Sequence, residues 1–380
     1  MNRPASTPDA DIALMRSIIQ RIATGPELSK DISADEARAG MSLILDGKVD
    51  PVQAAIFLIA LRMKRESDAE YCGVLDALRD ASDTVTVPVD ELLDIGDPYD
   101  GFIRSLPPSP FLPAVMAACG VPTVAHGVET MGPKYGVTHR QILRAAGISA
   151  DLSAAQTAQR LADKNIGWGY LDQQVFSPKL HRLAGLRTLI VKRPVLTTVE
   201  VCIGPLRARG RTHLMTGFVH KAYPRIYAML ARHAGFDSAL IVRGVEGGVI
   251  PTLRQTGKLF YFHDGGPEQM RELMPAEFGF DAPIRPVALP GVPDVANSTE
   301  NGPDNGRDSA PAPDHAAMVQ ATVELGLATL DGKAGPMRDA LISAAAVALV
   351  HIKRHDTLIS AANAVREVLS NGQAAAHFRR

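Results

Sequence analysis

The sequence predicts an α/β protein in which a small N-terminal helical bundle precedes a larger domain with a mainly parallel sheet flanked by helices. Residues 11–85 carry helix-start signals and apolar residues at helical spacing. From Leu92 onward, short apolar segments alternate with helical ones, a pattern typical of parallel strands joined by helices. A chain of 380 residues with 46% hydrophobic content can bury a core large enough for two domains.

Two helix starts in the N-terminal part are well marked. Ser33 and Glu36 form the pattern of a capping box, in which a hydroxyl and a carboxylate satisfy the free backbone N–H groups at a helix start. Asp50 followed by Pro51 is the second signal, because proline at the first helical position loses no hydrogen bond. The sequence therefore predicts helices after Ser33 and after Asp50.

The larger domain is predicted from short apolar runs. Residues 288–313 are rich in Pro, Gly, Asn, Asp and Ser, and we expect a flexible surface insertion there. Helices are predicted to resume at His315. The predicted strands are Leu92–Ile95, Pro122–Ala125, Ala239–Val242 and Leu259–Phe262.

Composition excludes several classes of protein. The net charge of −1 argues against a polycation, and no apolar run approaches the ~20 residues that span a bilayer, so no membrane partner is expected. The N-terminal residues lack the apolar core of a secretory signal. The three cysteines, Cys72, Cys119 and Cys202, lie far apart without metal or redox spacing. We therefore predict a cytoplasmic protein.

Several segments together resemble one family. They are AACG, AHG and GPKYG between Asp94 and Ile148, the helical run from Asp31 to Ser67, GFDSALIVRGVEGG, and GPMRDALISAAAVALV. In residues and spacing they are similar to anthranilate phosphoribosyltransferases and their glycosyltransferase family 3 relatives.

The resemblance implies a nucleoside phosphorylase/phosphoribosyltransferase-like fold and a homodimer formed through the N-terminal helices. It also implies a domain division. A helical domain would span residues 1–88, joined by helices from about 172–204, and an α/β domain would comprise 89–171 and 205–380.

The chemistry of that family is largely missing from the matching positions. Its Gly-rich GTGGD diphosphate loop falls on Asp97–Gly101, where Pro98 removes an N–H donor and the two aspartates add negative charge. The Asn-x-Ser-Thr run falls on Pro107–Pro110, where Ser109 survives. The Asp-Glu pair that would hold Mg²⁺ falls on Val249–Ile250. The lysine before His-Gly is Ala125, and the Asn-Arg pair after it is Val128–Glu129. We therefore expect no cofactor, no metal, and no standard Mg²⁺-dependent phosphoribosyl transfer.

Other positions keep polar residues that could bind a ligand. His126 and Glu246 are the catalytic candidates, although a histidine satisfied by local backbone is an equal alternative for His126. Lys134 could bind phosphate or be a solvated loop lysine. Arg187 falls at the family's carboxylate-binding arginine, where an ion pair within one helix or between helices is the competing interpretation. The predicted substrate-binding residues are Tyr99, Asp100, Ser109, His126, Lys134, Arg187, Arg193, Arg207, Arg209 and Arg211.

A basic stretch between residues 179 and 232 gives a signal independent of family. Between Gln173 and Phe236 the only acidic residue is Glu200. Arg207–Arg211 (RARGR) is interpreted as a loop whose guanidinium groups could hold phosphates. The stretch predicts an anionic partner, either a phosphorylated small molecule or nucleic acid. The alternative is a solvated basic face that pairs with acidic surface elsewhere on the protein.

Two function classes follow. The first is a pentosyltransferase-like enzyme of glycosyltransferase family 3 that acts on an unidentified phosphorylated ligand and is not a standard anthranilate phosphoribosyltransferase. The second is a non-catalytic homodimer that binds nucleic acid or a phosphorylated ligand.

Overall fold

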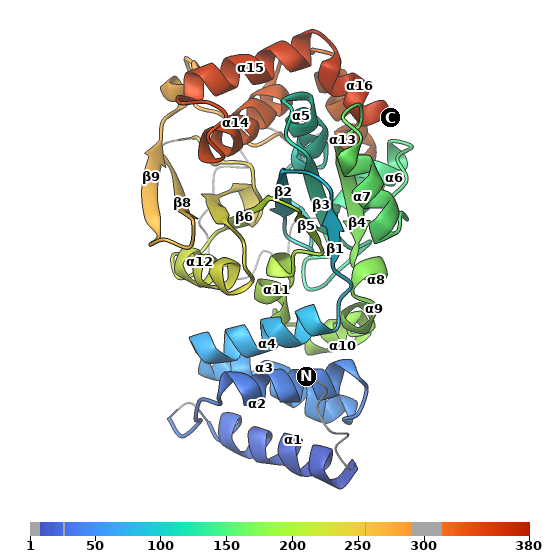
Figure 1. Ribbon diagram of the computed structural model, residues 1–380, viewed down its shortest axis with the longest axis vertical. Helices are drawn as coiled ribbons and strands as arrows, with labels where there is room; N and C mark the ends of the chain where they lie inside the picture. The colour runs from blue at the N-terminus through green and yellow to red at the C-terminus, as the bar shows by residue number, and fades with distance from the viewer. Residues whose placement is uncertain (1–7, 26, 255, 291–313) are drawn as a thin grey trace.

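The computed structural model describes residues 8–25, 27–254, 256–290 and 314–380. A helical bundle lies at one end of the molecule and an α/β domain at the other, with the two chain termini on opposite parts (Figure 1). Helices α9 (Pro178–His181) and α10 (Ala184–Ile190) lie beside the bundle (Figure 1). The predicted fold class is confirmed. The predicted insertion at 288–313 falls outside the described residues from position 291 onward.

The bundle begins as the capping signals predict. The Ser33 hydroxyl accepts from the backbone N–H of Glu36, and the Glu36 carboxylate accepts from the backbone N–H of Ser33. The Asp50 carboxylate caps the next helix by accepting from Val52 N–H. The helices are α1 (Pro8–Ile22), α2 (Ala34–Leu45), α3 (Pro51–Lys64) and α4 (Asp68–Asp80), followed later by α8 (Gln173–Phe176), α9 (Pro178–His181), α10 (Ala184–Ile190) and α11 (Leu196–Val199).

A seven-stranded sheet forms the centre of the α/β domain. Its spatial order is β4-β3-β2-β6-β7-β8-β9; the pairs from β4 to β7 are parallel, whereas β8 and β9 are antiparallel. The strands are β2 (Glu91–Gly96), β3 (Thr123–Gly127), β4 (Trp168–Asp172), β6 (Arg211–Phe218), β7 (Ser238–Arg243), β8 (Gly257–His263) and β9 (Gln269–Leu273), and a separate parallel pair joins β1 (Val85–Val87) to β5 (Leu206–Ala208).

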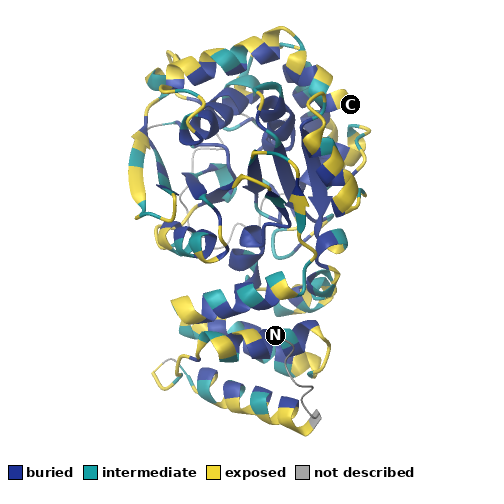
Figure 2. Cartoon of the chain, viewed as in Figure 1, coloured by how far each residue is buried: buried dark blue, intermediate teal, exposed yellow. Residues whose placement is uncertain are grey.

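Helices cover the sheet, whose central strands are buried on both faces (Figure 2). Alternate residues of one strand therefore enter different cores: Leu92 packs in the core shared with the N-terminal bundle, and Leu93 in the core under the C-terminal helices. The remaining helices are α5 (Leu112–Ala118), α6 (His139–Ala145), α7 (Ala154–Ala162), α12 (Tyr223–His233), α13 (His315–Leu330), α14 (Pro336–His351), α15 (Leu358–Ser370) and α16 (Gln373–Arg379). In the described part of the chain, no helix has the length and apolar character needed to cross a membrane.

The segment Arg207–Arg211 is not the loop that its arginines suggest. Arg207 lies in β5, and Arg211 begins β6. Only the turn at positions 209 and 210 separates these strands. The loop prediction is wrong because the backbone of this segment pairs with β1 on one side and with β2 on the other.

Candidate functional site

The polar residues of the candidate site gather at the carboxyl edge of the parallel strands, where ligands bind in open α/β sheets. Two loops cross there without side chains between them. A Cβ on Gly101 would lie 2.6 Å from the backbone of Gly136, so glycine is required for this close approach. The crossing fixes the loop after β2 against the loop after β3.

His126 lies at the centre of a fully buried network. Its Nε2 is 2.8 Å from Asp94 Oδ1, and its Nδ1 is 2.5 Å from the Tyr99 hydroxyl. Because a carboxylate only accepts, Nε2–H donates to Asp94, and Nδ1 then accepts from Tyr99. Burial first, and then nearby acidic groups, raise the pKa of Tyr99 well above its usual value, so its hydroxyl keeps the proton. Both nitrogens of His126 are thus engaged.

A second histidine keeps one nitrogen open. His139 Nε2 lies 2.8 Å from Asp97 Oδ2 and 3.0 Å from Ser109 Oγ, and the Ser109 hydroxyl donates to the same carboxylate oxygen at 2.5 Å. Val249 N–H donates to the other oxygen, Oδ1, at 2.8 Å. The His139 Nδ1 is buried and has no hydrogen-bond partner among the described residues. It is therefore the group at which a ligand could complete a hydrogen bond.

The two networks border one small pocket with about 10 Å³ of free space, roughly enough for a single water molecule. The predicted residues Tyr99 and His126 both line it, whereas Ser109 lies behind the pocket on Asp97. The lining residues are Asp97, Pro98, Tyr99, His126, Gly127, Val128, Thr138 and His139.

Three predicted residues meet at Asp100. Arg193 donates from Nε and Nη2 to Asp100 Oδ2, at 3.0 and 2.8 Å, and Lys134 Nζ lies 3.4 Å from Oδ1. The Asp100 side chain is 4% exposed. The two cations that were predicted to bind an anionic ligand are therefore paired with a carboxylate of the chain itself.

Glu246 fills a backbone cradle in the same way. Its carboxylate accepts from Ile103 N–H at 3.0 Å, from Arg104 N–H at 2.9 Å and from the Ser105 hydroxyl at 3.0 Å. Two successive backbone N–H groups of this kind are a typical anion site. Glu246 reaches them from a left-handed backbone conformation with φ of 52°. The catalytic candidate is thus engaged in holding the loop after β2.

The family's metal position does not fit a metal here. Val249 and Ile250 are 0% and 4% exposed and pack in the apolar core. Mg²⁺ requires oxygen ligands, which these side chains lack. Within the described ranges, no cluster of three or more His, Cys, Asp or Glu side chains could hold a metal ion.

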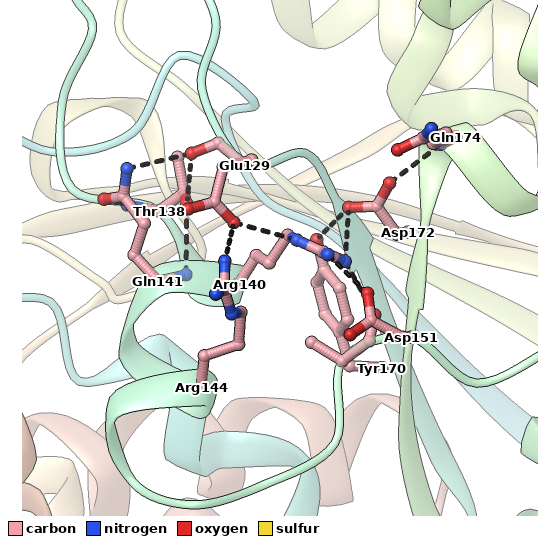
Figure 3. Close-up of polar contacts among 10 residues, drawn as sticks. Glu129, Thr138, Arg140, Gln141, Arg144, Asp151, Tyr170, Asp172 and Gln174 are labelled. Atoms are coloured by element: carbon pink, nitrogen blue, oxygen red, sulfur yellow. Dashed lines mark hydrogen bonds and ion pairs between the residues drawn. The ribbon is translucent and has the colours of Figure 1, made fainter.

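Glu129 is a further carboxylate at this edge (Figure 3). Its Oε2 accepts from Arg140 at 2.8 Å and from Arg144 at 3.1 Å, while Arg140 also contacts Asp151 and lies 3.3 Å from Asp172. The backbone carbonyl of Glu129 accepts from Thr138 and Gln141 (Figure 3). Glu129, at the position of the family's Asn-Arg pair, thus connects the loop after β3 to α6 through these hydrogen bonds and ion pairs.

Arg187 forms a buried ion pair. Its Nη1 and Nη2 each lie 2.7 Å from a different oxygen of Glu200, and both side chains are at most 2% exposed. Burial acts to lower the pKa of Arg187, but the attraction of Glu200 outweighs burial and raises it. Of the two interpretations of Arg187, the geometry matches the ion pair between helical segments, since Glu200 already fills the bidentate fork.

Arg207 is also a structural residue. Its guanidinium carbon lies 3.8 Å from the centroid of the Phe236 ring, and the group donates to the carbonyls of Gly204, Ala234 and Gly235. Burial lowers the pKa of Arg207 to about 10. The side chain thus stabilises the end of α12 and does not point its charge to a ligand.

Four other cations of the basic stretch have acidic partners from distant segments. Arg209 and Arg211, both predicted site residues, lie at the surface away from the pocket. Acidic residues from other segments therefore compensate part of the charge of the stretch in the folded chain. The ion pairs are Lys179 with Asp46, Arg209 with Asp90, Arg211 with Asp264 and Arg225 with Asp68.

Sequence reasoning identified His126, Asp100 and Glu246 but missed other acidic and histidine residues that shape the site. His139 gave no signal beyond its place after the helix cap at Thr138. Asp94 offered one, because it is a charged residue in a buried strand and needs a partner. Asp97 was visible only as added negative charge, and Glu200 only as the single acidic residue of the basic stretch.

The fold and the site together define a protein with a helical bundle and a phosphoribosyltransferase-type α/β domain. Residues 16–82 match the helical bundle domain of the glycosyl transferase family. The anthranilate phosphoribosyltransferase of Novosphingobium aromaticivorans is 27% identical over 350 residues, which cover 91% of this chain and 96% of that protein. That of Bradyrhizobium diazoefficiens is 28% identical over 341 residues, covering 85% and 96%.

Solved structures agree in fold. Anthranilate phosphoribosyltransferase from Thermus thermophilus superimposes with a TM-score of 0.72 at 21% identity over 97% of both chains. The Saccharomyces cerevisiae enzyme in complex with PRPP and Mg gives 0.73 at 16% identity, covering 97% of this chain and 96% of that one. The chain is thus similar in sequence and in fold to the anthranilate phosphoribosyltransferases of glycosyltransferase family 3.

Proposed function

We propose that this chain is a pentosyltransferase-like protein that does not perform the Mg²⁺-dependent phosphoribosyl transfer of its relatives. One observation carries the proposal: the chain's own carboxylates occupy the hydrogen-bond donors of the cleft. Asp100 holds Lys134 and Arg193, and Glu246 holds the N–H groups of Ile103 and Arg104. A diphosphate would have to displace both carboxylates without a metal to neutralise its charge.

The pocket between the two histidines offers a hydrogen-bonding position for one small polar group of a ligand. The free Nδ1 of His139 would accept a hydrogen bond from an O–H or N–H group of the ligand. His126 could remove a proton from a ligand only after Tyr99 gives up its hydrogen bond to Nδ1. A phosphorylated ligand retains one route into the cleft, the displacement of Asp100 from Lys134 and Arg193.

Titration calorimetry with phosphoribosyl diphosphate, with and without Mg²⁺, tests the proposal. We expect no metal-dependent heat, because Val249 and Ile250 supply no metal ligand. One of the anthranilate phosphoribosyltransferase relatives serves as the positive control. Tight Mg²⁺-dependent binding to this chain would contradict the proposal.

Nucleic-acid binding is the second candidate, supported by the exposure of several basic side chains. Arg209 and Arg225 are 68% and 62% exposed and hold their acidic partners only at the surface. Exposed pairs of this kind are weak and can be exchanged for phosphates. Binding to a labelled DNA duplex should weaken steeply with salt, and Arg225→Ala should reduce the slope by about one. Absence of binding at low salt would exclude this candidate.

A homodimer through the N-terminal helices is part of both candidates. Met63 of α3 and Leu189 of α10 are 73% and 79% exposed, and Val52 and Val191 add to the exposed apolar surface of these neighbouring segments. A second copy of the chain would bury this surface. Sedimentation equilibrium should show a dimer for the native chain and a shift toward monomer for Met63→Lys.

A further inference from the structure

A second group of titratable residues lies at the opposite, amino edge of the sheet. His213 is near the start of β6, Ser238 starts β7, and His263 ends the antiparallel strand β8. His351, the last residue of α14, reaches them from the C-terminal helices. The group therefore joins the buried helix α14 to three strands.

A continuous chain of hydrogen bonds connects these residues. Ser238 Oγ lies 2.7 Å from His213 Nδ1 and 2.8 Å from His351 Nε2, and His213 Nε2 lies 3.2 Å from Glu91 Oε1. Since Glu91 accepts, His213 is protonated on Nε2, its Nδ1 accepts from the Ser238 hydroxyl, and Ser238 accepts from His351 Nε2–H. When both histidines are neutral, each donor in this row of hydrogen bonds has one acceptor.

His351 leaves no place for a second proton. Its Nδ1 is buried without a hydrogen-bond partner among the described residues, and the residue is 6% exposed. The His263 ring stacks on the His351 ring at a centroid distance of 4.4 Å, and His263 Nε2–H donates to the His351 carbonyl at 2.8 Å. A proton on Nδ1 would be a buried charge without an acceptor.

The surroundings of His351 reinforce this. The groups that face it are the rings of His213, Tyr261 and His263 and the nearby ammonium of Lys353, while Glu91 is directed to His213 and Arg354. Burial, followed by His263, His213 and Lys353, places the pKa of His351 well below its usual value. Ser238 is fully buried, so the Glu91–His213–Ser238 row has no exposed nucleophile.

We propose that the His213–Ser238–His351 row is an acid-sensitive latch that fixes the C-terminal end of α14 to the sheet. Above pH ~6.5 the histidine is neutral in both the folded and the unfolded chain, and the latch is closed. Below that pH the unfolded or released histidine binds a proton that the closed latch cannot hold, so stability falls as the pH falls.

The latch also has a path to the other edge of the sheet. Helix α14 is buried along most of its length, and Ala340, near its start, lines a small cavity with Leu106 and Ile250. This cavity lies next to the loops of the candidate site. Loosening of α14 at its far end would therefore act on the packing behind those loops.

Unfolding of the full chain at pH 7.5 and 5.5 tests the latch. His351→Gln keeps an N–H donor for Ser238 but cannot titrate. Protonation of His351 in the unfolded chain should make the unfolding equilibrium constant of the native chain about tenfold larger at pH 5.5 than at pH 7.5. His351→Gln should lack this part of the acid effect. His220→Gln, at an exposed histidine, is the matched control and should behave like the native chain. An unchanged acid effect in His351→Gln would overturn the proposal.

NMR titration of the native chain needs no variant to fold. The ring signals of His351 should stay unshifted down to pH 5.5. A His351 that titrates near pH 6.5 would also overturn the proposal.

Discussion

Two kinds of ion pair arise from the same basic stretch of this chain, and burial separates them. The Arg187–Glu200 pair is enclosed by the helical segments, with both side chains at most 2% exposed. The Arg225–Asp68 pair lies on the surface, with the two side chains 62% and 53% exposed. In the sequence both arginines belong to one positive run, but only the exposed one can exchange its partner for a ligand at little cost.

The same distinction applies to the candidate site. Asp100 and Asp97 are buried carboxylates with complete sets of partners, so their removal should change the site itself. A charged residue in this sequence therefore indicates little about function until the residue that pairs with it in the fold is known. Substitutions at both kinds of pair can test it.

Glu200→Ala should have the largest effect. It leaves the Arg187 guanidinium buried without its counter-charge, which costs roughly 3–5 kcal/mol of unfolding free energy. Urea denaturation measures the loss. The double variant Arg187→Met, Glu200→Leu should recover most of it. A loss for Glu200→Ala no greater than that of a surface pair would erase the distinction.

Tyr99→Phe should rank second. The change keeps the ring but removes the hydroxyl that donates to His126 Nδ1, leaving a buried acceptor unpaired at a cost of about 1–3 kcal/mol. The exposed Tyr135→Phe is the control. Equal stability of the two variants would show that the His126 network is not formed.

Glu36→Gln is an intermediate case, at a pair about one third exposed. The hydrogen bond from Arg21, and then that from Ser33 N–H, lowers the pKa of Glu36 to about 2. The stabilisation of the fold by ionised Glu36 should be fully present above the ordinary glutamate pKa of ~4.3 and should be lost as the pH falls toward 2. After allowance for solvent, we expect about 1 kcal/mol at pH 7 from thermal unfolding, and a difference from native that vanishes in strong acid.

Arg225→Ala should have the smallest effect, roughly 0–1 kcal/mol, and the difference should shrink as salt is added. Thermal unfolding at low and high ionic strength measures it. A salt-independent loss of several kcal/mol would place this surface pair in the same class as Arg187–Glu200.

Much of the fold could be predicted from local sequence. The capping box at Ser33 and the proline after Asp50 act over a few residues, and both helices begin where these signals place them. Strand β6 was missed because its segment carries Arg211 and His213, which look like ligand-binding residues in the sequence. In the sheet, His213 of this strand has hydrogen-bond partners on the neighbouring strands, Ser238 of β7 and Glu91 of β2.

The site was less predictable, for a physical reason. The loss of the family's diphosphate and metal residues could be read position by position. The replacements could not, because Arg193 meets Asp100 across 93 residues and Glu246 meets Arg104 across 142. Contacts at such separations depend on the closed fold and leave no spacing signal.

We propose that Asp100 occupies the place of an anion between Lys134 and Arg193. Titration calorimetry with inorganic pyrophosphate should compare the native chain with Asp100→Asn, using the exposed Asp90→Asn as a control with the same change in net charge. We predict that Asp100→Asn gains at least about tenfold in affinity while the other two proteins do not. Equal affinities for all three, or tight binding to the native chain, would contradict the claim.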